Sequence, residues 1–263
     1  MKDKERLDKL LSELGLVETR AKAQALIMAG NVRVNGQVIT KAGALFSHDA
    51  AISVEGVSQW AGRGAQKLLR AFEVFPLDVA GKVCADFGAS TGGFTDVLLA
   101  NGASKIYAID VGYGQLIWRL ASDPRVVVMD RTNARYMTRK DFPETIEFAS
   151  CDVSFISLRL ILPVLDDVVS GEAVVLIKPQ FEAGRERISK GVVRDKAIHA
   201  EVLAEILSFV REHTSFTVEG LTHSPIKGPE GNIEFLCHLT RSGNATNQDV
   251  DVIVNEAHEI LGR

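Results

Sequence analysis

The chain has 263 residues, of which 46% are hydrophobic and 24% are charged. This composition is close to the average of soluble globular proteins, and it excludes wholesale disorder, collagen and coiled-coil arrays. A chain of this length forms one large domain or a small domain joined to a medium one. The formal net charge of −4 supplies no overall positive field, so any contact with RNA must come from a local basic surface.

No run reaches the roughly 18 apolar residues of a membrane span, and the N-terminal segment MKDKERLDKLLSEL is charged where a signal peptide would be apolar. We therefore expect a cytoplasmic protein without a membrane partner. The cysteines Cys84, Cys151 and Cys237 are widely spaced and form no CxxC pair. This pattern fits a reducing compartment and predicts packed thiols in the core, not a disulfide framework or a cysteine-rich zinc site.

The first residues predict two short helices and a hairpin. Apolar residues recur at helical spacing over residues 7–14 and stop before Gly15, and a second helical pattern follows Thr19 and ends at Gly30. Thr19 is the expected N-cap. The dipeptide Asn35-Gly36 lies between alternating residues, which is a strong signal for a β-hairpin.

This order of elements, with RLDKLLSELGLVETRAKAQALIMAGNVRVNGQVITKAG, resembles the RNA-binding fold named after small-subunit ribosomal protein four. The resemblance implies that residues 1–58 form a domain that binds structured RNA. It implies phosphate contacts for the basic residues Arg6, Lys9, Arg20, Lys22, Arg33 and Lys41. The alternative is that these are ordinary solvated charges, nearly balanced by acidic neighbours. Residues 59–64 are the expected linker, with Trp60 among glycines.

Residues 65–263 predict an open α/β domain. The apolar runs KVCADFGA, KIYAID, RVVVMD, IEFASCDV and EAVVLIKP indicate buried parallel strands that alternate with helical or loop sequence. A final pair, FTVEGLTHS and IEFLCHLTR, lacks a long helix between its members and indicates an antiparallel edge. A terminal helix is expected over residues 249–261. The expected fold class is a Rossmann-like α/β sheet with a small N-terminal α+β domain.

The first predicted strand runs into the glycine-rich loop of DFGASTGGFTDV, and a helix begins near Phe94. A glycine-rich loop alone would also allow a dinucleotide site, but its spacing is neither the GxGxxG fingerprint nor a Walker motif. Asp110 ends the next strand about twenty residues later, where a carboxylate can bind ribose hydroxyls. Asp130 ends the third strand, where the alternative role is turn formation.

These features resemble the S-adenosylmethionine site of Rossmann-like methyltransferases. The resemblance implies cofactor contacts for Asp86, Gly88, Ser90, Gly92, Gly93, Phe94, Asp110 and Asp130. Asp86 would orient the glycine loop and the methionine moiety, Asp110 would hold the ribose, and Asp130 would contact adenine.

Four polar residues lie at element ends of the same domain: Lys67, Asp152, Lys178 and Glu234. Their order, with the flanking Ile-Lys-Pro and Asn-Ile-Glu-Phe, resembles the Lys-Asp-Lys-Glu tetrad of the heat-shock-type (FtsJ-like) ribose 2′-O-methyltransferases. A ribose hydroxyl must surrender its proton during methyl transfer, and a lysine accepts it only when partly neutral. Burial beside a second cation favours the neutral form, whereas a carboxylate too close to the lysine would restore its charge. The resemblance implies that Lys178 is this base.

No metal is expected, because the methyl donor already carries the electrophile and the histidines show no ligand spacing. Cys151 could be a nucleophile, but a core thiol is the simpler interpretation. The basic residues Arg185, Arg187, Lys190 and Arg194 either contact phosphates near the site or belong to a solvated loop.

The combined layout of both domains resembles the TlyA family, also known as haemolysin A. The resemblance implies an S-adenosylmethionine-dependent cytidine 2′-O-methyltransferase acting on ribosomal RNA within ribosomal subunits. Two alternatives belong to other classes: a non-catalytic RNA-binding or ribosome-assembly factor, and a membrane-active haemolysin.

Overall fold

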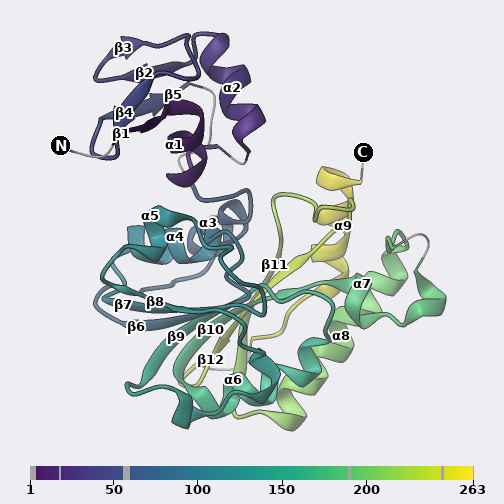
Figure 1. Cartoon of the computed structure of the whole chain (residues 1–263). Coiled ribbons are helices and arrows are strands. Elements are labelled where there is room, and N and C mark those ends of the chain that lie inside the picture. Colours follow the sequence, from purple (N-terminus) through teal and green to yellow (C-terminus); the bar gives the residue numbers. More distant parts are fainter. Residues whose placement is uncertain (1–3, 18, 56–59, 189–190, 244–245, 263) are drawn as a thin grey trace.

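The computed structural model in Figure 1 describes residues 4–17, 19–55, 60–188, 191–243 and 246–262. Residues 56–59, which include the start of the expected linker, and Lys190 lie outside the described residues. A small domain and a larger one follow each other along the chain (Figure 1).

The small domain packs two helices on short strands. Its helices are α1 (Leu7–Glu13) and α2 (Arg20–Met28). Its strands are β1 (Lys4–Arg6), β2 (Val32–Val34), β3 (Gln37–Val38), β4 (Leu45–Ser47) and β5 (Ile52–Val54). β1 pairs with β4, and β2 lies between β3 and β5, all antiparallel. The predicted helices and hairpin are confirmed, whereas β1, β4 and β5 were not predicted.

Local chemistry explains the ends of these elements. The Thr19 hydroxyl accepts a hydrogen bond from the Lys22 backbone N–H at 3.2 Å, which confirms the predicted N-cap of α2. Asn35 and Gly36 both have positive φ, 50° and 81°. Two successive left-handed residues make a type I′ turn, which matches the twist of the β2–β3 hairpin.

Seven strands of the described chain form the large sheet, in the order β11-β12-β10-β9-β6-β7-β8. They are β6 (Val83–Phe87), β7 (Lys105–Ile109), β8 (Val126–Met129), β9 (Ile146–Cys151), β10 (Val169–Ile177), β11 (Thr217–His223) and β12 (Phe235–Thr240). β6 to β10 are parallel, and β12 is antiparallel to both β10 and β11. The predicted strands and the antiparallel pair are confirmed.

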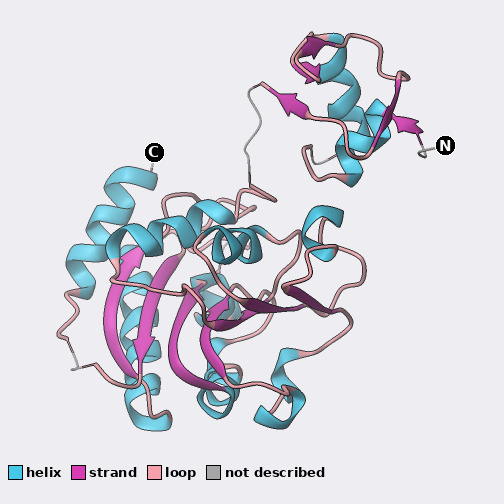
Figure 2. Cartoon of the chain, turned by 90° about the vertical axis from the view of Figure 1, so that its left-hand side faces the viewer, coloured by secondary structure: helices cyan, strands magenta, loops and turns pink. Residues whose placement is uncertain are grey.

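Helices cover both faces of this sheet, as Figure 2 shows. On one face lie α3 (Ala65–Val74), α4 (Gly93–Ala100) and α5 (Trp118–Ala121), and on the other α6 (Leu162–Val168), α8 (Lys196–His213) and α9 (Val250–Leu261). The short helix α7 (Pro179–Glu182) follows β10. Single 3₁₀ turns span Ala134–Tyr136, Arg139–Asp141, Leu158–Leu160 and Arg185–Arg187. The expected terminal helix is α9.

The core thiols are confirmed, because all cysteines are buried and free. Burial raises the pKa of Cys151 to about 12, so this thiol stays protonated and cannot act as a nucleophile at neutral pH.

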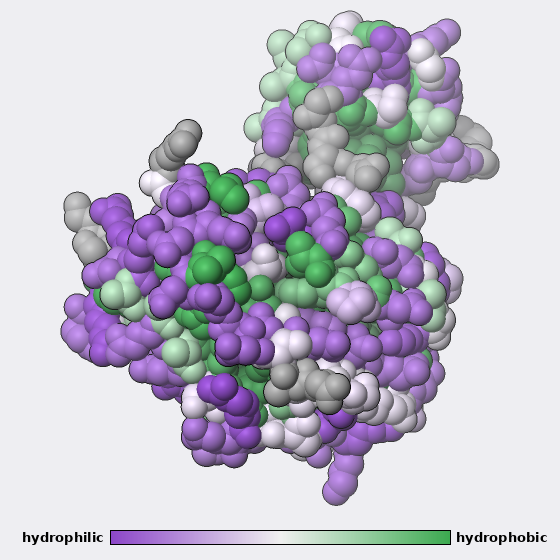
Figure 3. Space-filling view, turned by 180° about the vertical axis from the view of Figure 1, so that it is seen from behind, coloured by the Kyte–Doolittle hydropathy of each residue, from purple (hydrophilic) through white to green (hydrophobic). Residues whose placement is uncertain are grey.

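No helix of the described residues is long and apolar enough to cross a membrane. The face in Figure 3 is mostly hydrophilic, with separate hydrophobic patches.

The two domains touch through a small contact. A Cβ atom on Gly15 would lie 2.8 Å from the Ile117 Cβ, so the glycine allows α1 to end against the larger domain. The rings of His48 and Trp118 lie 6.0 Å apart, centroid to centroid. The contact therefore joins the small domain to α5 and the residue before it.

Candidate active site

The tetrad predicted from the sequence assembles at one edge of the sheet. Asp152 follows β9 and Lys178 follows β10. Glu234 precedes β12, and because β12 is antiparallel to β10, with Phe235 opposite Ile177, its start lies beside the end of β10. Lys67 comes from the first turn of α3. Sheet topology thus brings together residues that are far apart in the chain.

The tetrad side chains form a continuous series of contacts. Lys67 Nζ lies 2.7 Å from Glu234 Oε2 and 3.5 Å from Asp152 Oδ2. Lys178 Nζ lies 2.5 Å from Asp152 Oδ1. Lys67, Lys178 and Glu234 are buried, and Asp152 is 17% exposed at its side chain. The carboxylates of Asp152 and Glu234 both face the ammonium group of Lys67, so this buried charge is compensated.

Lys67 is held as a cation. Burial lowers the pKa of Lys67, but the charges of Asp152 and Glu234 and their hydrogen bonds more than offset this effect, so the pKa is raised above its ordinary value. A lysine that keeps its proton cannot accept another. Lys67 can therefore orient the two carboxylates but cannot serve as a base.

Two further side chains complete this cluster and were missed in the sequence. Lys178 Nζ donates a hydrogen bond to Ser154 Oγ at 2.8 Å, and Gln180 Nε2 donates to Glu234 Oε1 at 3.2 Å. Ser154 follows Asp152 by two positions and Gln180 follows Lys178 by two. Their places just after strand ends were the signal that could have identified them.

The tetrad opens onto a cavity of about 260 Å³. Its described lining comprises Gly62, Arg63, Gly64, Lys67, Gly88, Ala89, Ser90, Thr91, Gly93, Phe94, Asp152, Ser154, Lys178, Ile226, Lys227, Gly228 and Pro229. The glycine-rich loop after β6 and the lysines of the tetrad therefore share one cavity. A ligand on the loop would meet Lys178 directly.

The glycines of this loop allow close packing of the protein on itself. Gly88 has φ +87°, and a Cβ there would lie 2.7 Å from the Asp152 carbonyl oxygen. A Cβ on Gly93 would lie 2.9 Å from the Ala65 backbone nitrogen, at the start of α3. Gly92, with φ +102°, packs on Leu116 and Leu120. The loop is thus seated against the segments that carry Asp152 and Lys67.

Asp110 and Asp130 lie at the ends of the next two strands. Asp110 accepts hydrogen bonds from the backbone N–H groups of Ser90, at 2.8 Å, and Gly112, at 2.7 Å. Asp130 accepts one from Gly114 at 2.9 Å. Both are half-buried and keep lone pairs for further donors. Neither is among the described residues that line the cavity; they continue the same edge of the sheet beyond it.

Asp86 lies behind the loop. Its side chain is 0% exposed, and its oxygens accept hydrogen bonds from Thr95 Oγ1 at 2.7 Å and Ser150 Oγ at 2.9 Å. Burial raises its pKa to about 6 against the opposing effect of these bonds. This leaves no surface for the contact with a methionine moiety expected from the sequence. Asp86 instead ties β6 to α4 and β9 and so can orient the loop.

The basic residues of the small domain are mostly ion-paired. Asp8, which is 0% exposed, binds Arg6 Nη2 and Arg20 Nε, each at 3.0 Å, and Gln24 at 2.7 Å. Arg6 and Arg20 nevertheless keep 46% and 51% of their side chains exposed. Lys9 pairs with Glu5 and Glu13, and Arg33 with Glu55. Lys22 and Lys41 are exposed.

A larger cavity of about 1350 Å³ lies between the two domains. Its lining includes Lys22, His48, Trp60 and Trp118, and it shares residues 62–64 with the cavity of the tetrad. The cavity between the domains therefore adjoins the cavity of the tetrad at these residues.

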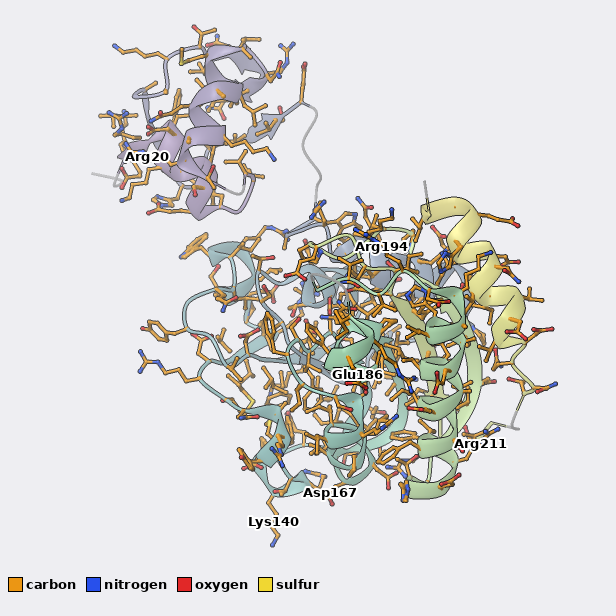
Figure 4. The ribbon with its side chains drawn as sticks, turned by 90° about the vertical axis from the view of Figure 1, so that its right-hand side faces the viewer. Arg20, Lys140, Asp167, Glu186, Arg194 and Arg211 are labelled. Atoms are coloured by element: carbon orange, nitrogen blue, oxygen red, sulfur yellow. The ribbon has the colours of Figure 1, made fainter. Side chains whose placement is uncertain are left out.

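Two of the basic residues after α7, Arg187 and Arg194, are not among the described residues that line the cavity of the tetrad. Arg187 pairs with Glu201 at 2.7 Å. Arg194 is exposed, at the end of the larger domain that faces the small domain in Figure 4, whereas Lys140 lies at the opposite end. Among the described residues, no group of three or more His, Cys, Asp or Glu side chains could hold a metal ion.

The sheet with its antiparallel β12, the glycine loop after the first of its strands and the acidic strand ends define a Rossmann-like methyltransferase. The site fits S-adenosylmethionine: a glycine-rich loop that lines the cavity, a buried lysine in the same cavity, and carboxylates after β7 and β8 further along the sheet edge.

Comparison with known proteins agrees. The model of FtsJ-like methyltransferases matches residues 60–241, and that of the S4 domain matches residues 5–50. The *Bacillus subtilis* protein YqxC is 48% identical over 98% of this chain and 95% of its own. The *Mycobacterium tuberculosis* 16S/23S rRNA (cytidine-2′-O)-methyltransferase TlyA is 43% identical over 89% of both chains. A solved structure of a hemolysin-named protein from *Streptococcus thermophilus* has a TM-score of 0.75 and 44% identity, covering 100% of this chain and 98% of that one.

The chain therefore belongs to the TlyA family of FtsJ-like methyltransferases that carry an S4 domain. It is a methyltransferase, and its cofactor is S-adenosylmethionine.

Proposed function

We propose that this protein transfers a methyl group to the 2′-hydroxyl of a cytidine in ribosomal RNA, with Lys178 as the base of the Lys-Asp-Lys-Glu tetrad. The observation that carries the proposal is the buried series Glu234–Lys67–Asp152–Lys178, which opens into the cavity of the glycine loop. The activity named for the *M. tuberculosis* relative supports cytidine in ribosomal RNA as the substrate.

Each tetrad residue has a distinct task in this proposal. S-adenosylmethionine supplies an electrophilic methyl group when bound. Lys178 Nζ, in its neutral form, takes the proton of the ribose hydroxyl as the oxygen attacks, and Asp152 and Ser154 fix its position. Lys67, held charged, keeps Asp152 and Glu234 in place. Gly88, Ser90, Gly92, Gly93 and Phe94 form the cradle, and Asp110 and Asp130 bind the nucleoside part.

The division into two domains supports RNA as the substrate. We assign residues 1–58 to RNA binding, 59–64 to the linker and 65–263 to methyl transfer. The small domain would hold folded RNA by its phosphates through Arg6, Lys9, Arg20, Lys22, Arg33 and Lys41, which raises the concentration of the target nucleotide at the cavity. The cavity between the domains adjoins the cavity of Lys178 at residues 62–64, and together they could admit an extruded nucleotide. Ribosomal subunits in the cytoplasm are the proposed partner.

The direct test incubates the purified protein with methyl-labelled S-adenosylmethionine and unmodified ribosomal subunits, then digests the RNA. Labelled 2′-O-methylcytidine is the expected product, and its subunit identifies the substrate particle. Cofactor binding without label on either subunit would point to another RNA. Absence of cofactor binding would instead favour the non-catalytic assembly factor, and leakage of lipid vesicles exposed to the same preparation would favour the haemolysin.

A further inference from the structure

The loop that follows β9 carries two residues of the site and one residue with an unfavourable backbone conformation. It carries Asp152 of the tetrad and Ser154, which contacts Lys178 Nζ. Phe155 in this loop has φ +63°, a left-handed conformation that costs free energy for a bulky residue, and its side chain is 89% exposed. A residue of this kind does not hold the loop by its own burial. The loop needs anchors elsewhere.

The loop is anchored by the end of β6 and by the segment that follows β10. At its start, the Asp152 N–H donates to the Phe87 carbonyl at 2.9 Å. In its middle, Ser154 meets Lys178, and the Phe155 ring lies 5.2 Å from the ring of Phe181. The segment 178–182, formed by Lys178 and α7, thus follows the loop along its length.

Glu182 anchors the far end of the loop. Its Oε2 accepts the Ser157 hydroxyl at 2.6 Å, and its Oε1 accepts the Leu158 N–H at 2.7 Å. Both oxygens are therefore engaged by the loop. Burial raises the pKa of Glu182, against the lowering effect of these two hydrogen bonds and of Arg159, while Glu205 raises it further. Glu182 is not among the described residues that line the cavity, so its carboxylate does not contact the reacting atoms.

We infer that Glu182 is a positioning residue for methyl transfer: its carboxylate fixes residues 152–158 so that Asp152 and Ser154 meet Lys178. The inference rests on the proposed function of Lys178. It follows from connectivity, because Glu182 is four residues after Lys178 and α7 joins the two rigidly. The base and the residue that anchors its orienting loop thus both follow β10, whereas the loop itself follows β9.

The test compares Glu182→Ala with the isosteric Glu182→Gln. In Glu182→Gln the amide oxygen still accepts the Leu158 N–H and the amide nitrogen donates to Ser157 Oγ, so activity should stay within about twofold of wild type. In Glu182→Ala both bonds are lost, and kcat should fall about 10- to 100-fold with KM for S-adenosylmethionine nearly unchanged. Ser157→Ala removes one of the two bonds to Glu182, together with the hydrogen bond that Ser157 Oγ accepts from the Arg159 N–H, and its kcat should fall between the two.

Hydrogen exchange supplies a readout that does not depend on activity. Amides of residues 153–158 should exchange faster in Glu182→Ala than in wild type or Glu182→Gln, whereas those of β6 should not change. Glu186→Ala is the matched control, since Glu186 is an exposed glutamate four residues further along (Figure 4). It should leave both kcat and exchange as in wild type.

Each unfavourable result has a separate meaning. Full activity of Glu182→Ala, or unchanged exchange at residues 153–158, would overturn the inference. A loss of activity caused by general unfolding would also overturn it. In that case heat or urea would unfold Glu182→Ala, Glu182→Gln and Ser157→Ala alike more easily than wild type. A wild-type protein that transfers no methyl group would instead refute the proposed function, and the positioning role would fall with it.

Discussion

Lys67 and Glu234 are separated by 167 positions in the chain, yet their Nζ and Oε2 atoms lie 2.7 Å apart in the interior. The side chains are 8% and 1% exposed. Removal of one partner from such a pair leaves an uncompensated buried charge, whereas replacement of both by apolar residues is often neutral. Replacing both residues should therefore change the free energy of unfolding little, whereas replacing only one of them should lower it considerably.

This difference predicts the stability of the single variants Glu234→Leu and Lys67→Met and of the double variant that combines them. Glu234→Leu alone should lower the free energy of unfolding by about 3 kcal/mol, at the low end of the usual range, because Asp152 still faces Lys67. Lys67→Met with Glu234→Leu should recover most of this loss and remain inactive. Urea unfolding measures all three. A double variant as unstable as the sum of the singles would mean that the two charges are not coupled.

Lys178→Ala should abolish methyl transfer without releasing RNA. Loss of a general base lowers the rate about 10²- to 10⁴-fold, while the proposed phosphate contacts lie in the other domain. The measurement is label transfer together with RNA binding by filter retention. Lys140→Ala, on the far end of the larger domain, is the control (Figure 4). A wild-type rate in Lys178→Ala would show that another group takes the proton.

The sequence could locate Lys67, Asp152, Lys178 and Glu234 because each lies at the end or start of a strongly patterned element. Runs such as EAVVLIKP are apolar up to the residue where the strand ends, so the polar residue that follows must lie at the sheet edge. The motif supplied their grouping, and the antiparallel β12 explains how Glu234 joins them.

Other contacts could not be predicted in this way. For Asp86 the resemblance implied a ligand contact, but alternation within β6 turns its side chain toward Thr95 and Ser150, where it is buried. The three-residue strands β1 and β4 are too short for a periodic signal. The hydrogen bonds of Glu182 depend on how α7 packs on a distant loop, which no local pattern encodes.

The buried carboxyl of Asp86 predicts a pH dependence of stability. Its pKa in the folded protein is raised to about 6, from an ordinary value of 3.8, chiefly by burial. The folded state therefore binds this proton more tightly than the unfolded chain, and its contribution to stability is full below about pH 4 and is lost as the pH rises through 6. Asp86→Asn removes this titration. Relative to wild type, its free energy of unfolding should rise by up to about 3 kcal/mol between pH 4 and pH 7, measured in urea. A constant difference across that range would show that Asp86 titrates normally.

Arg20→Ala tests whether the small domain holds RNA by its phosphates. Arg20 is half exposed, and Asp8 keeps Arg6 and Gln24 when it loses Arg20, so the domain should stay folded. Loss of one phosphate contact should weaken RNA binding at every sequence and reduce the slope of log K against log salt by about 1. Arg211→Ala is the matched control, at the C-terminal end of α8 and away from the small domain (Figure 4). Equal salt slopes for the two variants would mean that Arg20 serves only to neutralise the buried Asp8.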